Sequence, residues 1–233
     1  MPCTLPASLA DAAVCRSSFH AVLGGEAGEA VFADFSAALQ KAQAEGRILT
    51  ASLFRYENHL FFYAEGLNRP FTPQGLCPAL DAALLPWPPA LGEAAPRPWA
   101  AMQPYFYHDV PTTAADWQRG RCPQRRRGRI ALLPPDSWFS YMEHHLRIVT
   151  EGLVEGDRWH LICVQEGVLF SYLEEPRTNV NIKHRPGAHS PELDAWIAAD
   201  PESHFARFTP EQKAHPDSGH NFVFLPRIAG TED

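Results

Sequence analysis

Apolar residues along this chain follow two alternating patterns. Short runs rich in β-branched and aromatic residues, which are typical of strands, occur at 19–23 and 129–133. After each run, apolar residues recur every three or four positions, which predicts an amphipathic helix. These positions are Val31, Phe35, Ala38, Leu39 and Ala42 in the first helix and Phe139, Met142, Leu146, Val149 and Leu153 in the second. Asp136 or Ser137 can cap the second helix, and Gly46 and Gly156 are expected to end the two helices.

A hairpin is expected after each helix. The first hairpin would join strands 48–55 and 60–65, and the second would join strands 159–165 and 168–174. Part of the sequence repeats: the segment 60–65 returns 109 residues later as 169–174, with Leu, Phe, Tyr and Glu in register. Further ordered matches join 44–46 with 154–156, 78–82 with 191–195, and 105–107 with 222–224. The chain therefore reads as two copies of a unit with the element order βαββαβ.

This element order predicts an α+β fold made of two tandem ferredoxin-like repeats. We place the first repeat at 18–118, a basic linker at 119–128 and the second repeat at 129–228. Helices cover only one face of such a sheet, so the other face must be covered. We expect the two sheets to stack within the chain as an α/β-barrel pseudo-dimer, which makes the protein a monomer or a weak homodimer.

Composition excludes several classes of protein. The chain has 233 residues, 45% of them hydrophobic, and a formal net charge of −7, which is typical of a globular protein and unfavourable for nucleic-acid binding. No long apolar run or signal peptide is present, so no membrane association and a cytoplasmic location are expected. The five scattered cysteines are interpreted as reduced thiols. The arginines between the repeats are interpreted as a solvated linker, with a phosphate-binding patch as the alternative.

Tyr141 and His145 are the first candidates for chemistry, because residues four apart on a helix share a face. A hydrogen-bonded histidine at the edge of a helix is the alternative interpretation. Five further residues are candidates for binding a small molecule: Tyr172, Glu174, Tyr63, Trp159 and His160. Tyr172 shares a strand face with Glu174, and Tyr63 holds the matching position in the first repeat, so these side chains could line a cavity between the sheets. Packing of aromatic side chains in the core would give the same pattern.

Sequence motifs for nucleotide-dependent transfer, serine hydrolysis and zinc peptidase chemistry are absent from the chain. Neighbouring helical residues such as His144 and His145 point about 100° apart, which disfavours a metal site formed by this pair.

The second repeat resembles the L-rhamnose mutarotase family over roughly 129–228. The resemblance rests on the segments Tyr141–His145, Trp159–Glu174, Leu193–Asp200 and Phe222–Pro226. It implies an isomerase that interconverts the anomers of a small aldose by acid–base catalysis, with His145 and Tyr141 as catalytic residues. It also implies a monosaccharide ligand and no cofactor.

The same architecture leaves other functions open. The protein could be a cofactor-free monooxygenase, a haem-handling protein, or a non-catalytic module that binds or senses a small molecule.

Overall fold

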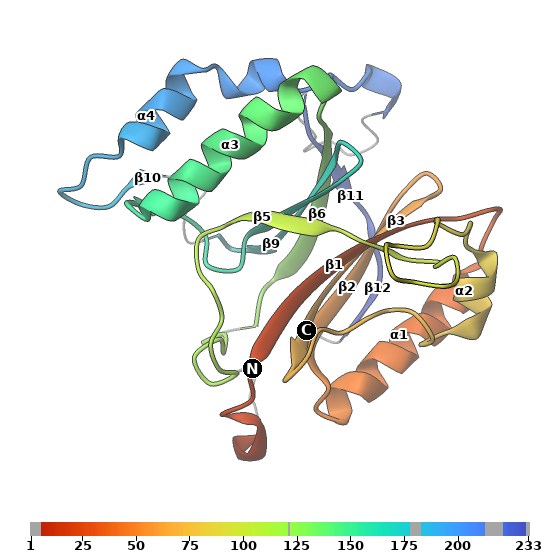
Figure 1. Ribbon diagram of the computed structural model, residues 1–233. Coiled ribbons are helices and arrows are strands. Elements are labelled where there is room, and N and C mark those ends of the chain that lie inside the picture. Colours follow the sequence, from red (N-terminus) through yellow and green to blue (C-terminus); the bar gives the residue numbers. More distant parts are fainter. Residues whose placement is uncertain (1–5, 121, 178–182, 213–220, 232–233) are drawn as a thin grey trace. The chain divides into compact units, whose positions relative to one another are not determined.

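A computed structural model of the chain describes residues 6–120, 122–177, 183–212 and 221–231. The chain forms two compact units, neither of which is continuous in sequence (Figure 1). Unit 1 comprises Met1–Met102, Pro111–Gln124 and Pro226–Asp233. Unit 2 comprises Gln103–Val110 and Arg125–Leu225. Within the described residues, each unit holds one antiparallel five-stranded sheet and two α-helices, so the predicted α+β class with two equivalent sheets is confirmed.

Unit 1 has the strand order β12-β2-β3-β1-β4. Its helices are α1 (Glu29–Ala44) and α2 (Pro78–Ala83), and its strands are β1 (Val14–Val22), β2 (Ile48–Tyr56), β3 (His59–Leu67), β4 (Ala100–Ala101) and β12 (Arg227–Gly230). Helix α1 buries Phe32 and Phe35, with Val31 half-buried, against the sheet residues Leu60 and Phe62. The apolar stripe of this helix therefore faces the core, as its spacing predicts.

Unit 2 has the matching strand order β11-β6-β9-β8-β5. Its helices α3 (Pro135–Glu151) and α4 (Pro191–Ala198) lie together (Figure 1). The strands are β5 (Gln103–Tyr107), β6 (Arg125–Leu132), β8 (Leu161–Gln165), β9 (Val168–Glu175) and β11 (Val223–Leu225), and a separate pair is formed by β7 (Val154–Glu155) and β10 (Lys183–His184). The predicted tight turn between β8 and β9 is present, with positive φ at Glu166 and Gly167.

The strands that follow β4 and β11 in the chain pair with the sheet of the other unit, which the repeat does not predict. After β4, the chain passes Met102 and continues as β5, which pairs with β8 in the sheet of unit 2. After β11, it passes Pro226 and continues as β12, which pairs with β2 in the sheet of unit 1. Each sheet therefore takes one edge strand from the opposite half of the sequence. Stacking of the two sheets stays a prediction.

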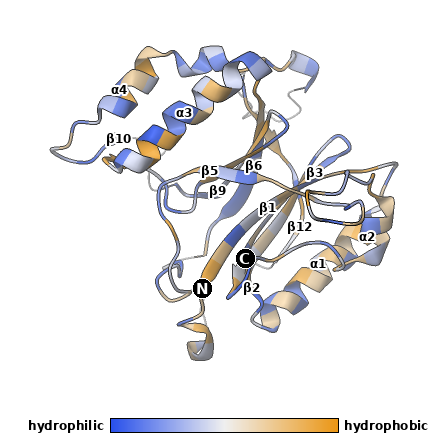
Figure 2. Ribbon diagram, viewed as in Figure 1, coloured by the Kyte–Doolittle hydropathy of each residue, from blue (hydrophilic) through white to orange (hydrophobic). Residues whose placement is uncertain are grey.

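Helix α3 is present where the sequence predicts it, but its orientation differs. Its buried residues are Tyr141, His145 and Ile148, whereas Phe139 and Leu146 of the predicted stripe are 71% and 59% exposed. Figure 2 shows polar and apolar residues interspersed along this helix. Burial of His145 costs little because its ring nitrogen has a backbone partner and its faces meet aromatic rings. The helix ends at Gly152, in the left-handed conformation, and not at Gly156.

Side-chain caps and free thiols are fewer than expected. Pro134 occupies the N-cap of α3 with no side-chain hydrogen bond, so neither Asp136 nor Ser137 caps this helix. Cys122 forms a disulfide, which corrects the interpretation of all five cysteines as reduced. Cys15, Cys77 and Cys163 are free.

No helix within the described ranges is both long and apolar enough to span a membrane.

Candidate functional site

Unit 2 contains a cavity of about 380 Å³ between its helices and its sheet. This volume lies in the range of small-molecule sites. Its walls combine the aromatic rings of Phe, Tyr and Trp residues with ionisable histidine, arginine and carboxylate side chains. The residues that line it include Phe106, His108, Arg129, Tyr141, His145, Gly156, Asp157, His160, Arg177, Trp196, Glu202, Phe205 and Phe222.

Helix α3 supplies the central pair of the cavity. Tyr141 and His145 lie one turn apart, and their rings are 4.2 Å apart between centroids. The ring of Trp196 from α4 meets both of them edge-on, at 5.2 Å from Tyr141 and 4.7 Å from His145. Phe106 from β5 meets the ring of His145 at 4.8 Å. The imidazole is thus held in one orientation by rings from three elements.

The protonation state of His145 follows from its hydrogen bond. Its Nδ1 lies 2.9 Å from the backbone carbonyl oxygen of Tyr141, which can only accept, so Nδ1 carries the proton. In a neutral imidazole the remaining nitrogen, Nε2, is then an acceptor. Burial lowers the pKa of His145 to about 4, against the raising effect of the Tyr141 carbonyl. Near neutral pH His145 is therefore a neutral base within the cavity.

The pKa of Tyr141 is shifted in the opposite direction, upwards. Burial raises the pKa of its hydroxyl to about 12, although the positive charge of Arg129 acts to lower it. The hydroxyl stays protonated near neutral pH and can donate a hydrogen bond to a ligand.

A second neutral histidine, His108, follows β5 directly. Burial, together with the charge of Arg177, lowers the pKa of His108 to about 4. Its ring lies against Gly156, where a Cβ atom would overlap the imidazole. Because Gly156 has no side chain, the His108 ring can occupy the space beside it.

Replacing Gly156 by Ala is expected to displace the His108 ring and to lower the free energy of unfolding by about 1–3 kcal/mol, the usual cost of overpacking. Urea denaturation measures this loss. Gly120→Ala is the control, because a Cβ there meets no atom within 4 Å. Equal stability of the two variants would contradict the close fit between Gly156 and His108.

Charged groups in the cavity differ in how they are paired. Nε of Arg177 lies 3.6 Å from Oδ2 of Asp157, which is buried. Asn221 donates a hydrogen bond to the carboxylate of Glu202. Arg129 has the aromatic ring of Phe222 at 4.2 Å, and its Nε is buried without a hydrogen-bond partner. Burial and the charge of Arg177 lower the pKa of Arg129 to about 10, so it remains a cation near neutral pH.

Three of the residues predicted from the sequence line the cavity: Tyr141, His145 and His160. Trp159, next to His160, does not line it. The roles assigned to these side chains stay predictions.

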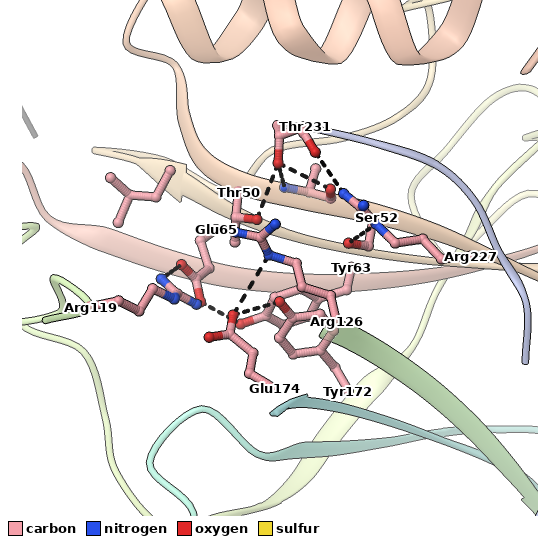
Figure 3. A network of polar contacts seen from close by, with 12 residues as sticks. Thr50, Ser52, Tyr63, Glu65, Arg119, Arg126, Tyr172, Glu174, Arg227 and Thr231 are labelled. Atoms are coloured by element: carbon pink, nitrogen blue, oxygen red, sulfur yellow. Dashed lines mark hydrogen bonds and ion pairs between the residues drawn. The ribbon is translucent and has the colours of Figure 1, made fainter. Parts of the chain in front are cut away.

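Tyr172, Glu174 and Tyr63 lie elsewhere. Within unit 2, Tyr172 donates a 2.7 Å hydrogen bond to Glu174, and Arg126 lies 3.9 Å from the same carboxylate (Figure 3). Within unit 1, Tyr63 donates a 2.7 Å hydrogen bond to Glu65, which also forms a salt bridge with Arg119 (Figure 3). The matched Tyr and Glu residues of the two repeats thus make equivalent hydrogen bonds inside their own units.

Sequence reasoning missed five polar residues of the cavity: His108, Arg129, Asp157, Arg177 and Glu202. One available signal was the period of two along β6, which places Arg125, Arg127 and Arg129 on the same face of a strand. Within the described residues, no group of three or more His, Cys, Asp or Glu side chains is arranged to hold a metal ion.

Comparison with known proteins gives matches only among solved structures. No protein-family model and no curated protein matches the sequence. A "putative monooxygenase" from Lactobacillus acidophilus NCFM superposes with a TM-score of 0.40 and 6% identity, over 94% of this chain and 96% of that chain. Another, from Fusobacterium nucleatum subsp. nucleatum, gives 0.41 and 10%, over 94% of both chains. An "anthrone oxidase-like protein" gives 0.39 and 7%, over 99% of this chain and 94% of that chain.

These comparisons correct the resemblance inferred from the sequence. No family model matches the chain, that of the L-rhamnose mutarotases included, and the similar structures are named as two putative monooxygenases and an anthrone oxidase-like protein. The assignment of the chain as an isomerase acting on a carbohydrate is therefore wrong. The resemblance depended on short segments of helix and hairpin, such as Tyr141–His145, which many proteins with this order of elements can share.

Proposed function

We propose that unit 2 is a cofactor-independent monooxygenase that oxidises a planar, weakly acidic small molecule. The neutral His145, which presents an unprotonated Nε2 in an aromatic cavity, carries this proposal. Flat rings suit the walls that Phe106, Trp196 and Phe205 form, because aromatic rings pack well against each other by offset stacking or edge-to-face contact. The activity is the one named for two of the similar structures, and it is proposed here from the side chains of the cavity.

The reaction requires a base and stabilisation of an anion. Nε2 of His145 would accept a proton from the substrate, and the carbanion so formed would react with molecular oxygen. One oxygen atom remains in the product as a carbonyl and the other leaves as water, so that SH₂ + O₂ gives S=O + H₂O. The substrate supplies the electrons, and no external reductant is required.

A base with a pKa of about 4 is weak, so the surroundings must favour the charged products of proton transfer. Arg129 is half-buried and places a positive charge in the same cavity, with its Nε buried. Such a charge, fixed where negative charge develops, lowers the cost of forming the substrate anion. His145 and Arg129 therefore act together in the proposed reaction.

Oxygen uptake above the buffer rate tests the proposal, with anthrone, 1-naphthol and other planar enolisable compounds as substrates. Labelled O₂ should place one heavy oxygen atom in each product molecule. His145→Gln should lower the turnover rate by about 100-fold, within the usual weight of a positioned base, while its far-ultraviolet circular dichroism is unchanged.

The control variant is His189→Gln, since His189 has an exposed side chain and does not line the cavity. It should keep the wild-type rate. Wild-type protein that binds these compounds but consumes no oxygen would contradict the enzymatic proposal and favour a binding module. Full activity in His145→Gln would contradict the role of His145.

A further inference from the structure

Two arginines on one face of β6 have different surroundings. The guanidinium carbon of Arg127 lies 3.8 Å from the ring centroid of Phe224, and Nη1 donates a 2.8 Å hydrogen bond to Glu175. Arg129 repeats the contact with an aromatic ring, at 4.2 Å from Phe222. Among the described residues, none accepts a hydrogen bond from Arg129, and no carboxylate lies within ion-pair distance of it.

The register of the sheet explains the difference. Arg127 stands opposite Leu173, and the carboxylate of Glu175 follows two positions along β9 on the same face. Arg129 stands opposite Ser171, and the residue two positions along is Leu173. The neighbouring strand therefore supplies an acidic partner to Arg127 and none to Arg129.

The acidic groups of the cavity are engaged with other partners. Asp157 is paired with Arg177, and Glu202 accepts a hydrogen bond from Asn221. The negative charge of Glu202 acts on Arg129 only from beyond ion-pair distance. The histidines of the α3 and β5 sides, His145 and His108, are neutral near pH 7. Arg129 is thus left as a cation whose buried Nε has no acceptor, and such a group is costly unless a ligand supplies one.

We propose that Arg129 binds the carboxylate of a planar aromatic acid, whose ring occupies the aromatic part of the cavity. This inference rests on the proposed function, because it names the substrate class of the same cavity. The carboxylate would be conjugated with the carbon that loses the proton, so that the negative charge formed there is shared with the group that Arg129 binds. An Nε–H and a neighbouring Nη–H form parallel donors that match the two oxygens of a carboxylate. The ring of Phe222 supports the guanidinium and restricts its orientation. A phenolate offers the same oxyanion chemistry through a single oxygen.

Calorimetric titration with matched ligands tests the proposal at pH 7. 2-Naphthoate should bind wild-type protein at least tenfold more tightly than 2-naphthamide, which has nearly the same shape and no charge. Arg129→Met should weaken the binding of 2-naphthoate at least tenfold and leave that of 2-naphthamide unchanged. Arg125→Met is the control, because Arg125 lies on the same strand with an exposed side chain, and it should change neither affinity.

Arg129→Lys keeps the charge but loses the forked pair of donors, so its preference for 2-naphthoate should fall between those of the wild type and Arg129→Met. This variant also keeps the test informative if Arg129→Met does not fold.

Titration with 2,4-dinitrophenolate, which is ionised at pH 7, distinguishes the two sources of the oxyanion. Binding of the phenolate more tightly than 2-naphthoate would overturn the choice of a carboxylate.

Equal affinity of wild-type protein for 2-naphthoate and 2-naphthamide would overturn the proposal, and so would an unchanged preference in Arg129→Met. These outcomes are separate from those for the oxygenase. An Arg129-dependent preference without oxygen uptake would support this site and contradict the proposed reaction. Oxygen uptake without such a preference would support the proposed reaction and contradict this site.

Discussion

Arg119→Met is expected to lower the free energy of unfolding by about 3–5 kcal/mol, the usual cost of removing one partner from a buried ion pair. The guanidinium of Arg119 donates two hydrogen bonds to Glu65, of 2.7 and 2.8 Å, and both side chains are buried. Tyr63 and Trp117 donate to the same carboxylate. Without Arg119, these two neutral donors remain, but the charge of Glu65 has lost its nearest compensation. Urea denaturation at pH 7 measures the loss.

The pKa of Glu65 gives a second readout of the same pair. Burial alone would raise this pKa, but the charge and hydrogen bonds of Arg119 outweigh burial and lower it to about 2. In the wild type, the stability contributed by Glu65 is present above pH 4.5 and is lost as the pH falls towards 2. Adding Glu65→Gln to Arg119→Met should recover part of the lost stability at pH 7, because the double variant buries no charge. A double variant less stable than Arg119→Met would contradict this account.

The repeat and the secondary structure of the chain could be predicted because their signals are local. The period of three to four at Phe35 and Leu39 marks a buried helix face, and Gly46 adopts the positive φ that follows such a helix. Gly167 marks the turn of a hairpin in the same way. The two sheets then follow from the repeated element order, and the structure gives them equivalent strand orders.

The choice of sheet for an edge strand is not a local property, and it decides part of the cavity. The aromatic segment Tyr105–Tyr107 aligns with 222–224 in the repeat, which predicts that it closes the first repeat. In the structure it belongs to β5, whose counterpart by strand order is β12, and it pairs with β8. His108 therefore reaches the cavity of unit 2, although its sequence neighbours belong to the first half of the chain. No pattern within 105–108 distinguishes the two sheets.

Arg129 was missed for a different reason. Six arginines between 119 and 129 have the composition of a solvated linker, and composition takes no account of which face each residue occupies. In the structure, Arg119 and Arg126 are buried, Arg125 is exposed and Arg129 lines the cavity. Tyr141 and His145, in contrast, could be placed together from their spacing of four, because that spacing fixes a shared helix face whichever way the helix turns.

Acidification from pH 6.5 to pH 4 is expected to destabilise unit 2, largely through His145. An unfolded histidine titrates near pH 6.5, whereas burial lowers the pKa of His145 to about 4 in the folded protein. Between these values the unfolded chain binds more protons than the folded one, so the free energy of unfolding falls as the pH falls. At ~1.4 kcal/mol per pKa unit, the loss from this one residue is about 3 kcal/mol. Below pH 4 it does not increase further.

Urea denaturation from pH 4 to pH 8 measures this loss in the wild type and in His145→Gln. Gln does not titrate, and its amide can still donate to the Tyr141 carbonyl, so the variant should lose about 3 kcal/mol less than the wild type between pH 6.5 and 4. His108→Gln should reduce the loss by a smaller amount, because His108 is half-buried and solvent screens part of its charge. A slope in His145→Gln equal to that of the wild type would mean that the folded protein does not lower the pKa of His145. That result would contradict the account of His145 as a buried imidazole whose burial lowers its pKa.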